Sequence, residues 1–228
     1  MYRALITDLD GTAIPISSDG SDIDATTHRA VAQAVARGYK IACATGRHWE
    51  ITEPIVRRLG LVHPCIIEGG TRLVDAATGR TLWEKSFPPG VAQQLLAILH
   101  REVKAGQLMT SAANEIIRLE DTHSLPDGLR LLYLLALPEA LATKLVNQIT
   151  DHEATKQHAI KAWQKLEGVT QSETIGMGDS GNDLPIFEAS GLKVAVANAT
   201  PDVKELADYI APSVTDHALA HVIEKFML

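Results

Sequence analysis

Short apolar segments alternate with segments of helical periodicity at both ends of the chain, and this alternation most constrains the fold. In the first part, apolar runs at residues 4–8, 41–44 and 64–68 are separated by predicted helices at 25–37 and 49–59. Strand-helix-strand units of this kind are almost always right-handed and build parallel sheets. We therefore expect an α/β fold with a doubly wound, Rossmann-like parallel sheet.

The same alternation returns near the C-terminus. Strands are predicted at residues 173–178, 193–197 and 209–211, and helices at 183–190, 201–207 and 216–226. Aromatic residues make up only 4% of the chain, so its core must consist mainly of aliphatic side chains, which suits a buried parallel sheet. Both ends of the chain are therefore expected to form one domain.

The middle of the chain has a different pattern. A hairpin is predicted at 71–87 with strands 72–74 and 81–84, followed by a helix at 91–103, strand-like stretches at 107–119 and 129–137, and a helix at 139–149. We expect a discontinuous core of residues 1–69 and 152–228 and a small inserted α+β cap domain of residues 70–151. The predicted helix 139–149 runs almost directly into the returning segment, without intervening strands, so the cap is expected to be reduced.

Charge limits the partners that this chain can have. The formal net charge of −7 argues against broad contact with nucleic acid or an anionic membrane, because both need basic patches. The first residues lack the apolar stretch of a signal peptide, and no segment is long and apolar enough to span a bilayer, so a cytoplasmic location is expected. Cys43 and Cys65 lie in apolar runs and are interpreted as core thiols.

Two acidic loops follow predicted strands. Asp8 and Asp10 end the first strand and precede Gly11, while Asp179 and Asp183 follow the strand at 173–178. Ligands of open parallel sheets bind outside the carboxyl ends of the strands, and magnesium is held by carboxylates, water and substrate phosphate. Taken singly, an Asp-Gly turn or an N-cap aspartate would explain each loop, but the pairing of the two loops favours a metal site.

Two weaker signals lie between these loops. Thr45, Gly46 and Arg47 follow the second strand, where a hydroxyl and backbone amides at a helix N-terminus suit a phosphate group; an N-cap threonine with a turn glycine is the alternative. Lys156 opens the segment that returns from the insert to the core. A lone lysine at a helix start is more often solvated than catalytic.

Together these motifs resemble those of haloacid dehalogenase-like hydrolases. The order Asp8-Leu9-Asp10-Gly11-Thr12, then Thr45-Gly46-Arg47, then Lys156, then Gly178 to Asp183 is similar to the four motifs of that superfamily. The insert between the second and third motifs, and the stretch from Lys193 to Asp208, resemble the Cof-type branch of sugar-phosphate phosphatases. One departure follows the third strand, where many relatives have Asn-Gly and this chain has Glu68-Gly69-Gly70; a polar contact near the phosphate or the cap hinge is lost or rebuilt there.

The resemblance implies a role for each matching position. Asp8 is the expected nucleophile that becomes phosphorylated, and Asp10 the expected acid and base. Mg²⁺ is the implied cofactor, held by Asp8, the Asp10 backbone carbonyl, Asp179 and Asp183. Phosphate binding is expected from Gly11, Thr45, Gly46, Lys156 and Asn182, with Thr45 and Lys156 also catalytic, and substrate contacts are expected from Arg47 and Asn198.

The sequence thus predicts a magnesium-dependent phosphatase that hydrolyses a small phosphate monoester, with a sugar phosphate as the first choice. A phosphoglycolate-type phosphatase and a phosphomutase-like phosphotransferase are the alternatives, and a binding protein that keeps the fold without catalysis is a third. The expected partner is a small phosphorylated metabolite, and the protein is expected to be a monomer or a homodimer.

Overall fold

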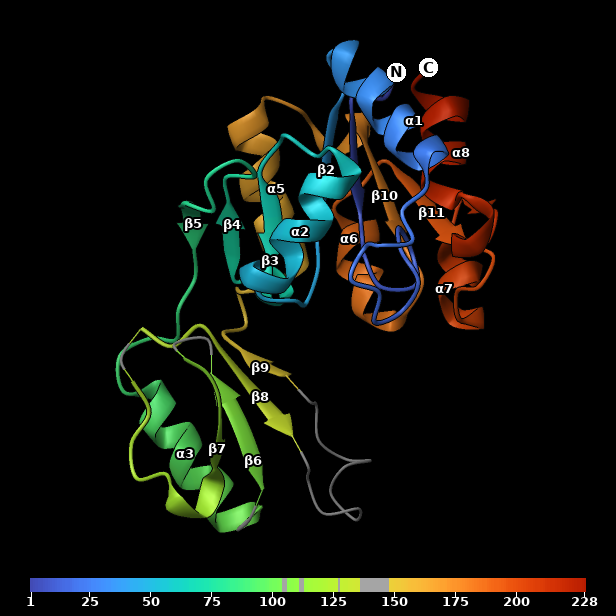
Figure 1. The fold of residues 1–228 in the computed structure, drawn as a ribbon. Helices are drawn as coiled ribbons and strands as arrows, with labels where there is room; N and C mark the ends of the chain where they lie inside the picture. The colour runs from blue at the N-terminus through green and yellow to red at the C-terminus, as the bar shows by residue number, and fades with distance from the viewer. Residues whose placement is uncertain (104–105, 111–112, 127, 136–147) are drawn as a thin grey trace. The chain divides into compact units, whose positions relative to one another are not determined.

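The computed structural model describes residues 1–103, 106–110, 113–126, 128–135 and 148–228 (Figure 1). The chain divides into two compact units, Met1–Trp83 with Lys156–Leu228, and Glu84–Thr155, here called the core unit and the insert unit. These boundaries differ from the expected ones. Residues 70–83 were expected in the cap and lie in the core unit, and residues 152–155 were expected in the core and lie in the insert unit. Residues 70–83 belong with the core unit because the hairpin that they form continues its edge, as described below.

The core unit contains a five-stranded parallel sheet (Figure 1). Its strands are β1 (Ala4–Thr7), β2 (Lys40–Cys43), β10 (Thr174–Gly178), β11 (Leu192–Val196) and β12 (Tyr209–Ala211), in the order β12-β11-β10-β1-β2. The chain builds outward from β1 to one side and later from β10 to the other, so the strand order reverses between β1 and β10. Ligands of doubly wound sheets bind at such a switch point.

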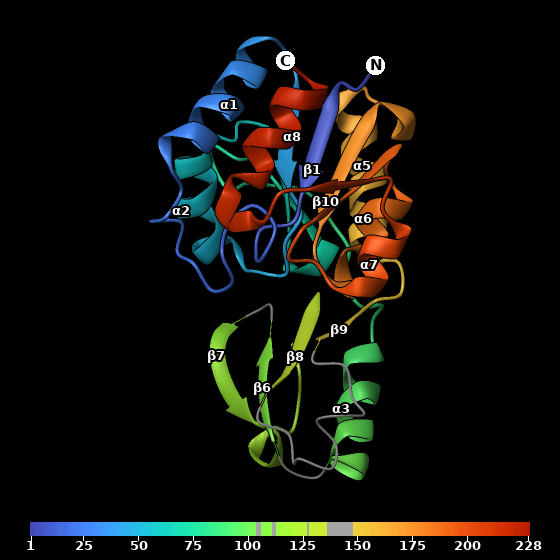
Figure 2. The same ribbon diagram turned by 90° about the vertical axis from the view of Figure 1, so that its right-hand side faces the viewer.

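Helices cover both faces of this sheet (Figure 2). They are α1 (Ala25–Ala36), α2 (Trp49–Leu59), α5 (Lys156–Glu167), α6 (Leu184–Glu188), α7 (Pro201–Leu206) and α8 (Ala218–Phe226). Successive residues of a strand point to opposite faces. Leu5 accordingly packs in the cluster of α1, α2 and α8, while its neighbours Ala4 and Ile6 pack in the cluster of α5 and α6 around Trp163. The α/β, doubly wound fold is confirmed.

A second sheet lies at the edge of the core unit. It consists of β3 (Cys65–Ile67), β4 (Arg72–Val74) and β5 (Thr81–Glu84), with β3 antiparallel to β4. A parallel bridge between Ala44 and Ile66 connects β3 to the segment that follows β2. The predicted hairpin strands 72–74 and 81–84 are confirmed, and the pairing of β4 with β3 explains why the hairpin groups with the core.

The insert unit packs α3 (Val91–Glu102) on an antiparallel sheet. The strands β6 (Gln107–Thr110), β7 (Ala113–Arg118), β8 (Leu131–Leu135) and β9 (Gln148–Thr150) lie in the order β7-β6-β8-β9. The expected single strand-like stretch 107–119 is therefore two antiparallel strands. The predicted helix 139–149 is wrong at residues 148 and 149, because β9 pairs there with β8, and its residues 139–147 lie outside the described residues. A strand thus does precede the return to the core.

Within the described ranges, we find no helix with the length and apolar character needed to cross a membrane.

Candidate active site

Three carboxylates meet at the switch point of the core sheet. Asp8 directly follows β1, Asp179 directly follows β10, and Asp183 ends the short turn that precedes α6. Because β1 and β10 pair in register through Thr7 and Met177, their carboxyl ends coincide, and the Asp8 amide donates to the Met177 carbonyl at 3.0 Å. One carboxylate oxygen from each of the three aspartates lies within 4.8 Å of the others.

Lys156 joins this carboxylate group from the first residue of α5. Its Nζ donates to Asp8 Oδ1 at 2.8 Å and to Asp183 Oδ1 at 2.7 Å. The side chains of all three residues are almost completely buried. The alternative interpretation of a solvated lysine is wrong, because this ammonium group lies inside the protein between two carboxylates.

The charges of this group are unbalanced. Burial raises the pKa of Asp8 to about 7, with Lys156 opposing and Asp183 adding to the effect. Burial and the negative charge of Asp183 likewise raise the pKa of Asp179 to about 6. Burial disfavours the charged form of Lys156, but Asp8 and Asp183 outweigh it and raise its pKa. Three carboxylates against one ammonium leave an excess of negative charge that a cation would relieve.

The donor set fits a hard divalent cation. Mg²⁺ prefers oxygen ligands and is usually bound by one or two carboxylates with water and phosphate oxygens. Asp8, Asp179 and Asp183 supply only carboxylate oxygens. Asp183 Oδ2 is fixed by the backbone amides of Asp179 and Ser180 at 3.0 and 3.2 Å, so this side chain also orients the loop that carries Asp179. The residues present therefore suit the predicted magnesium.

Asp10 is held apart from these three carboxylates. Arg47 Nε donates to Asp10 Oδ2 at 2.7 Å and Arg47 Nη2 donates to Asp10 Oδ1 at 2.5 Å, so the two side chains form a bidentate salt bridge. Arg47 Nη1 also donates to the Ser18 carbonyl at 2.8 Å, and the Ser17 amide donates to Asp10 Oδ1 at 3.0 Å. Arg47, expected to contact the substrate, thus orients the Asp10 carboxyl group in this structure.

Thr45 lies at the carboxyl end of β2 and is almost fully buried. Its amide donates to the Ile66 carbonyl and its carbonyl accepts from the Gly69 amide, both at 3.0 Å. Its hydroxyl accepts from the Arg47 amide at 3.2 Å. Gly46 lies between them, half-buried. The backbone of the segment Thr45 to Arg47, here called the threonine loop, is therefore held by hydrogen bonds within the core unit.

Asn198 and Asn182 contact other residues of the protein in this structure. Asn198 Nδ2 donates to the Gly11 carbonyl at 2.7 Å, and its Oδ1 accepts from the Val214 amide at 2.9 Å, so this side chain connects two loops of the core. Asn182 is exposed and accepts a hydrogen bond from Ser180 at 2.7 Å. Phosphate binding by Asn182 and substrate contact by Asn198 stay predictions.

Gly11 brings the loop after β1 against Asp179. Its φ of +80° lies in the left-handed region, and a Cβ there would lie 2.6 Å from Asp179 Oδ2. Thr12 Oγ1 donates to the other oxygen of Asp179 at 3.2 Å. The absence of a side chain at position 11 is therefore what allows this loop to enclose the Asp179 carboxylate.

Replacing Gly11 by alanine is expected to displace the Asp179 carboxylate. We expect Mg²⁺ affinity to fall by about tenfold to a hundredfold, the range found when the surroundings of metal ligands are disturbed. Gly38→Ala is the matched control, because Gly38 has a φ of +85° but a Cβ added there would meet nothing within 4 Å. The Mg²⁺ affinity of both variants is obtained from the rise in melting temperature across a magnesium titration. Equal loss in both would contradict the assignment, since it would show an effect of backbone strain alone.

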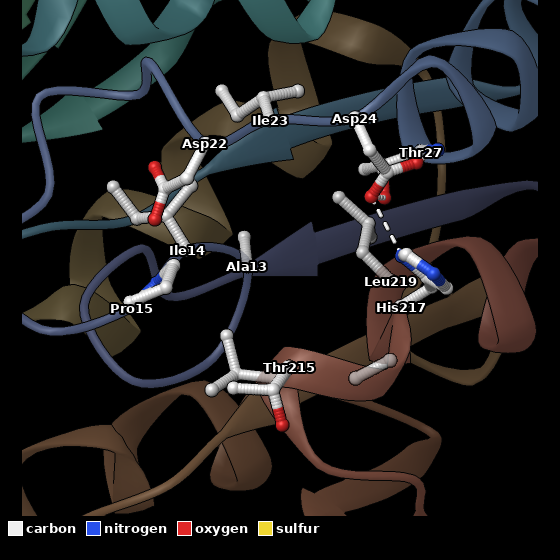
Figure 3. Close-up of a pocket in the computed structure, with 12 residues that line it drawn as sticks. Ala13, Ile14, Pro15, Asp22, Ile23, Asp24, Thr27, Thr215, His217 and Leu219 are labelled. Carbon is white, nitrogen blue, oxygen red and sulfur yellow. Dashed lines mark hydrogen bonds and ion pairs between the residues drawn. The ribbon is translucent and has the colours of Figure 1, made fainter.

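A separate cavity of about 260 Å³ lies between the loop after β1 and the start of α8 (Figure 3). Asp24 and His217 lie side by side in its lining, with Asp24 Oδ2 2.6 Å from His217 Nδ1. Asp24 also accepts from the amides of Thr26 and Thr27 as the N-cap of α1. These polar groups connect α1 to α8, so we assign them to the stability of the fold and not to catalysis.

Two buried polar residues lie beside the threonine loop; from the sequence, Glu68 was noted only as a departure from the family pattern and His48 was given no role. His48 is 5% exposed and Glu68 is 2% exposed, and the two approach to 3.5 Å through Nδ1 and Oε1. The only signal in the sequence was Glu68 itself, a charged residue directly after an apolar strand and before two glycines.

The fold and these residues define a class: doubly wound α/β proteins with two acidic loops that meet at the switch point of the sheet. The family model for haloacid dehalogenase-like hydrolases matches residues 5–126 and 142–223. The chain therefore belongs to this family, as its motifs predicted.

Relatives and solved structures agree with this membership. A phosphoglycolate phosphatase of Methanopyrus kandleri is 25% identical, over 100% of this chain and 98% of that protein. A phosphoglycolate phosphatase of Methanothermobacter thermautotrophicus is 33% identical over 39% of this chain and 40% of that protein, and a Bacillus subtilis relative is 40% identical over 36% of this chain. The chain thus spans less than half the length of two of these relatives: 40% of the Methanothermobacter protein and 30% of the Bacillus protein.

Among solved structures, a haloacid dehalogenase-like hydrolase from Bacteroides thetaiotaomicron superposes with a TM-score of 0.77 at 19% identity, covering 99% of both chains. The subclass IIB sugar phosphatase BT4131 gives a TM-score of 0.73 at 19% identity, covering 98% of both chains. At this identity the likeness establishes the shared fold.

Proposed function

We propose that this protein is a magnesium-dependent phosphatase that hydrolyses a small phosphate monoester through an aspartyl-phosphate on Asp8. One observation carries the proposal: the buried Asp8 carboxylate lies at the switch point between Lys156 and two further carboxylates. A carboxylate nucleophile with nearby positive charge is a sufficient set for phosphoryl transfer, in which positioning and charge neutralisation dominate.

In the first step, an Asp8 oxygen would attack phosphorus while the bond from phosphorus to the ester oxygen breaks. Asp10 would give its proton to that leaving oxygen, so the organic product departs as an alcohol. In the second step, water would attack the phosphorus of the aspartyl-phosphate and Asp10 would take its proton. Inorganic phosphate then leaves and the Asp8 carboxylate is restored. Arg47 donates to both oxygens of Asp10 in this structure, so Asp10 would have to leave this pair and turn toward the substrate for both proton transfers.

The remaining residues would bind the cation and the phosphate. Asp8, Asp179 and Asp183, with the Asp10 backbone carbonyl that the resemblance implies, would hold Mg²⁺, whose charge would offset that of the transferring group. Lys156, already directed at Asp8, would neutralise a phosphate oxygen. The backbone amides after Gly11, the threonine loop and Asn182 would supply further donors.

Two substrate classes deserve direct comparison. A sugar phosphate is the class first expected from the motifs. Phosphoglycolate is favoured by a specific observation, since the two relatives from Methanopyrus and Methanothermobacter are both named phosphoglycolate phosphatases and one aligns over its whole length. Both compounds present a phosphate monoester with a poor leaving group, which requires the proton that Asp10 would give.

The test is phosphate release by the purified protein from p-nitrophenyl phosphate, a panel of sugar phosphates and phosphoglycolate. We expect turnover with Mg²⁺ and none after chelation with EDTA, because the excess negative charge at Asp8 would otherwise repel the phosphate. Accumulation of a second phosphorylated acceptor in place of inorganic phosphate would instead indicate phosphotransfer. Absence of turnover on the whole panel with Mg²⁺ would contradict the proposal.

A further inference from the structure

Glu68 combines two features that a chain normally avoids. Its side chain is charged and only 2% exposed, and its φ of +52° lies in the left-handed region that favours glycine. Gly69 and Gly70 continue this positive φ. A strained residue persists only where its surroundings determine its conformation, and such residues concentrate at functional sites. The contacts of Glu68 show what this conformation achieves.

The backbone after β3 holds the threonine loop. Glu68 donates its amide to the Arg47 carbonyl, and Gly69 donates its amide to the Thr45 carbonyl, both at 3.0 Å. Two successive amides of an extended strand point to opposite sides. The left-handed conformation at Glu68 instead lets both amides reach carbonyls of the same loop.

The Glu68 side chain fixes this turn from the other side. Its Oε1 accepts from Arg72 Nη1 at 3.1 Å and lies 3.5 Å from Nδ1 of His48, the residue that follows the threonine loop. Its Oε2 accepts from Thr71 Oγ1 at 3.3 Å. Arg72 Nη2 in turn donates to Thr81 Oγ1 on β5 at 2.9 Å. Through Glu68, the threonine loop is therefore connected to both strands of the hairpin.

We infer that Glu68 is a positioning residue for phosphate binding, which acts through Thr45 without touching the substrate. The inference rests on the proposed function, in which the threonine loop binds the phosphate. The carboxylate pairs with Arg72 and His48, this pairing keeps Glu68 left-handed, and the left-handed backbone places Thr45 and Arg47. A polar contact was expected to be lost or rebuilt at this position, and the Glu68 carboxylate supplies one.

The test is the affinity of the magnesium-loaded protein for inorganic phosphate, measured as product inhibition. For Glu68→Ala we expect the inhibition constant and KM to rise together by about tenfold, since small displacements of a binding group are costly. Half-saturation by Mg²⁺ should stay unchanged, because the Glu68 carboxylate pairs with Arg72, Thr71 and His48 and the cation would bind to the three aspartates. Glu68→Gln keeps an acceptor for Thr71 and Arg72 and should show a smaller rise, which makes it the conservative variant if Glu68→Ala folds poorly.

Two further variants separate positioning from general stability. Arg72→Ala should weaken phosphate binding in the same direction, and the double variant should be little worse than either single one, because both remove the same connection. Glu167→Gln is the matched control: Glu167 pairs with His63 at 3.1 Å and Lys40 at 2.6 Å, elsewhere in the core unit. It is expected to lower the melting temperature without changing phosphate affinity.

Unchanged phosphate inhibition in folded Glu68→Ala and Glu68→Gln, with wild-type turnover normal, would overturn the positioning role alone. A rise in Glu167→Gln as large as that in Glu68→Gln would overturn it as well. A wild-type protein that neither binds phosphate nor hydrolyses esters would overturn the proposed function, and this inference with it.

Discussion

Asp8→Asn is expected to abolish phosphate release and, at the same time, to stabilise the protein in the absence of metal. The loss of activity should be on the order of 10,000-fold, as is typical when a covalent nucleophile is removed. The gain in stability follows from charge. Asp8 is buried beside Asp183 and Asp179, and asparagine keeps the shape of the side chain and an acceptor for Lys156 while removing one negative charge.

The stability gained in Asp8→Asn should depend on pH. The pKa of Asp8 is raised from an ordinary 3.8 to about 7 in the folded protein, so the folded state binds this proton more tightly than the unfolded state does. Its contribution favours folding at low pH and is lost as the pH rises from about 4 through 7. The melting temperature of metal-free Asp8→Asn should therefore exceed that of the wild type at pH 8, by an amount that shrinks toward pH 5.

With Mg²⁺ bound, the wild type should have a higher melting temperature than Asp8→Asn. The wild type gains more from the cation than Asp8→Asn does, because the variant has lost one of the three carboxylates. Melting curves at pH 5 and pH 8, with Mg²⁺ and with EDTA, measure all of these effects. Asp75→Asn is the control, since Asp75 is a partly exposed aspartate in the turn of the core hairpin. Magnesium-dependent turnover that survives in Asp8→Asn would exclude Asp8 as the nucleophile.

The strands of the core could be placed closely from the sequence. A parallel strand that is buried on both faces is a short, continuous apolar run, so β1 and β2 were each predicted within about one residue of their ends. The insert was harder. Only Ser111 and Ala112 separate β6 from β7, and this pair contains neither glycine nor proline, so the pattern was interpreted as one strand. Strand β9 has just three residues, and its partner β8 is what defines it.

Some contacts of the candidate site could likewise be predicted from the sequence, and others could not. The positions of Asp8 and Asp179 follow from where β1 and β10 end, and any doubly wound sheet brings such ends together. The contacts of Arg47 with Asp10, and of Glu68 with His48 and Arg72, depend on how loops approach one another in three dimensions. No spacing in the sequence specifies such approaches, so these partners required the structure.

Lys156→Met is expected to abolish activity and to destabilise the metal-free protein more than any surface substitution. Methionine fills a similar volume but leaves Asp8 and Asp183 buried without their common counterion. Removing one partner of a buried ion pair costs about 3–5 kcal/mol, which corresponds to a fall in melting temperature of roughly 10 °C for a domain of this size. Lys40→Met is the control, because its pair with Glu167 is partly exposed and should contribute about 1 kcal/mol or less.

The direction of the pH effect distinguishes this mechanism from a simple packing defect. Without the ammonium group, nothing opposes the burial that raises the pKa of Asp8, so its folded-state pKa should rise further above 7. Stability of Lys156→Met should then increase steeply as the pH falls from 8 to 5, and Mg²⁺ at pH 8 should restore part of the loss by supplying the missing positive charge. A variant that melts like Lys40→Met at pH 8, or whose deficit is independent of both pH and Mg²⁺, would show that Lys156 does not neutralise this carboxylate group.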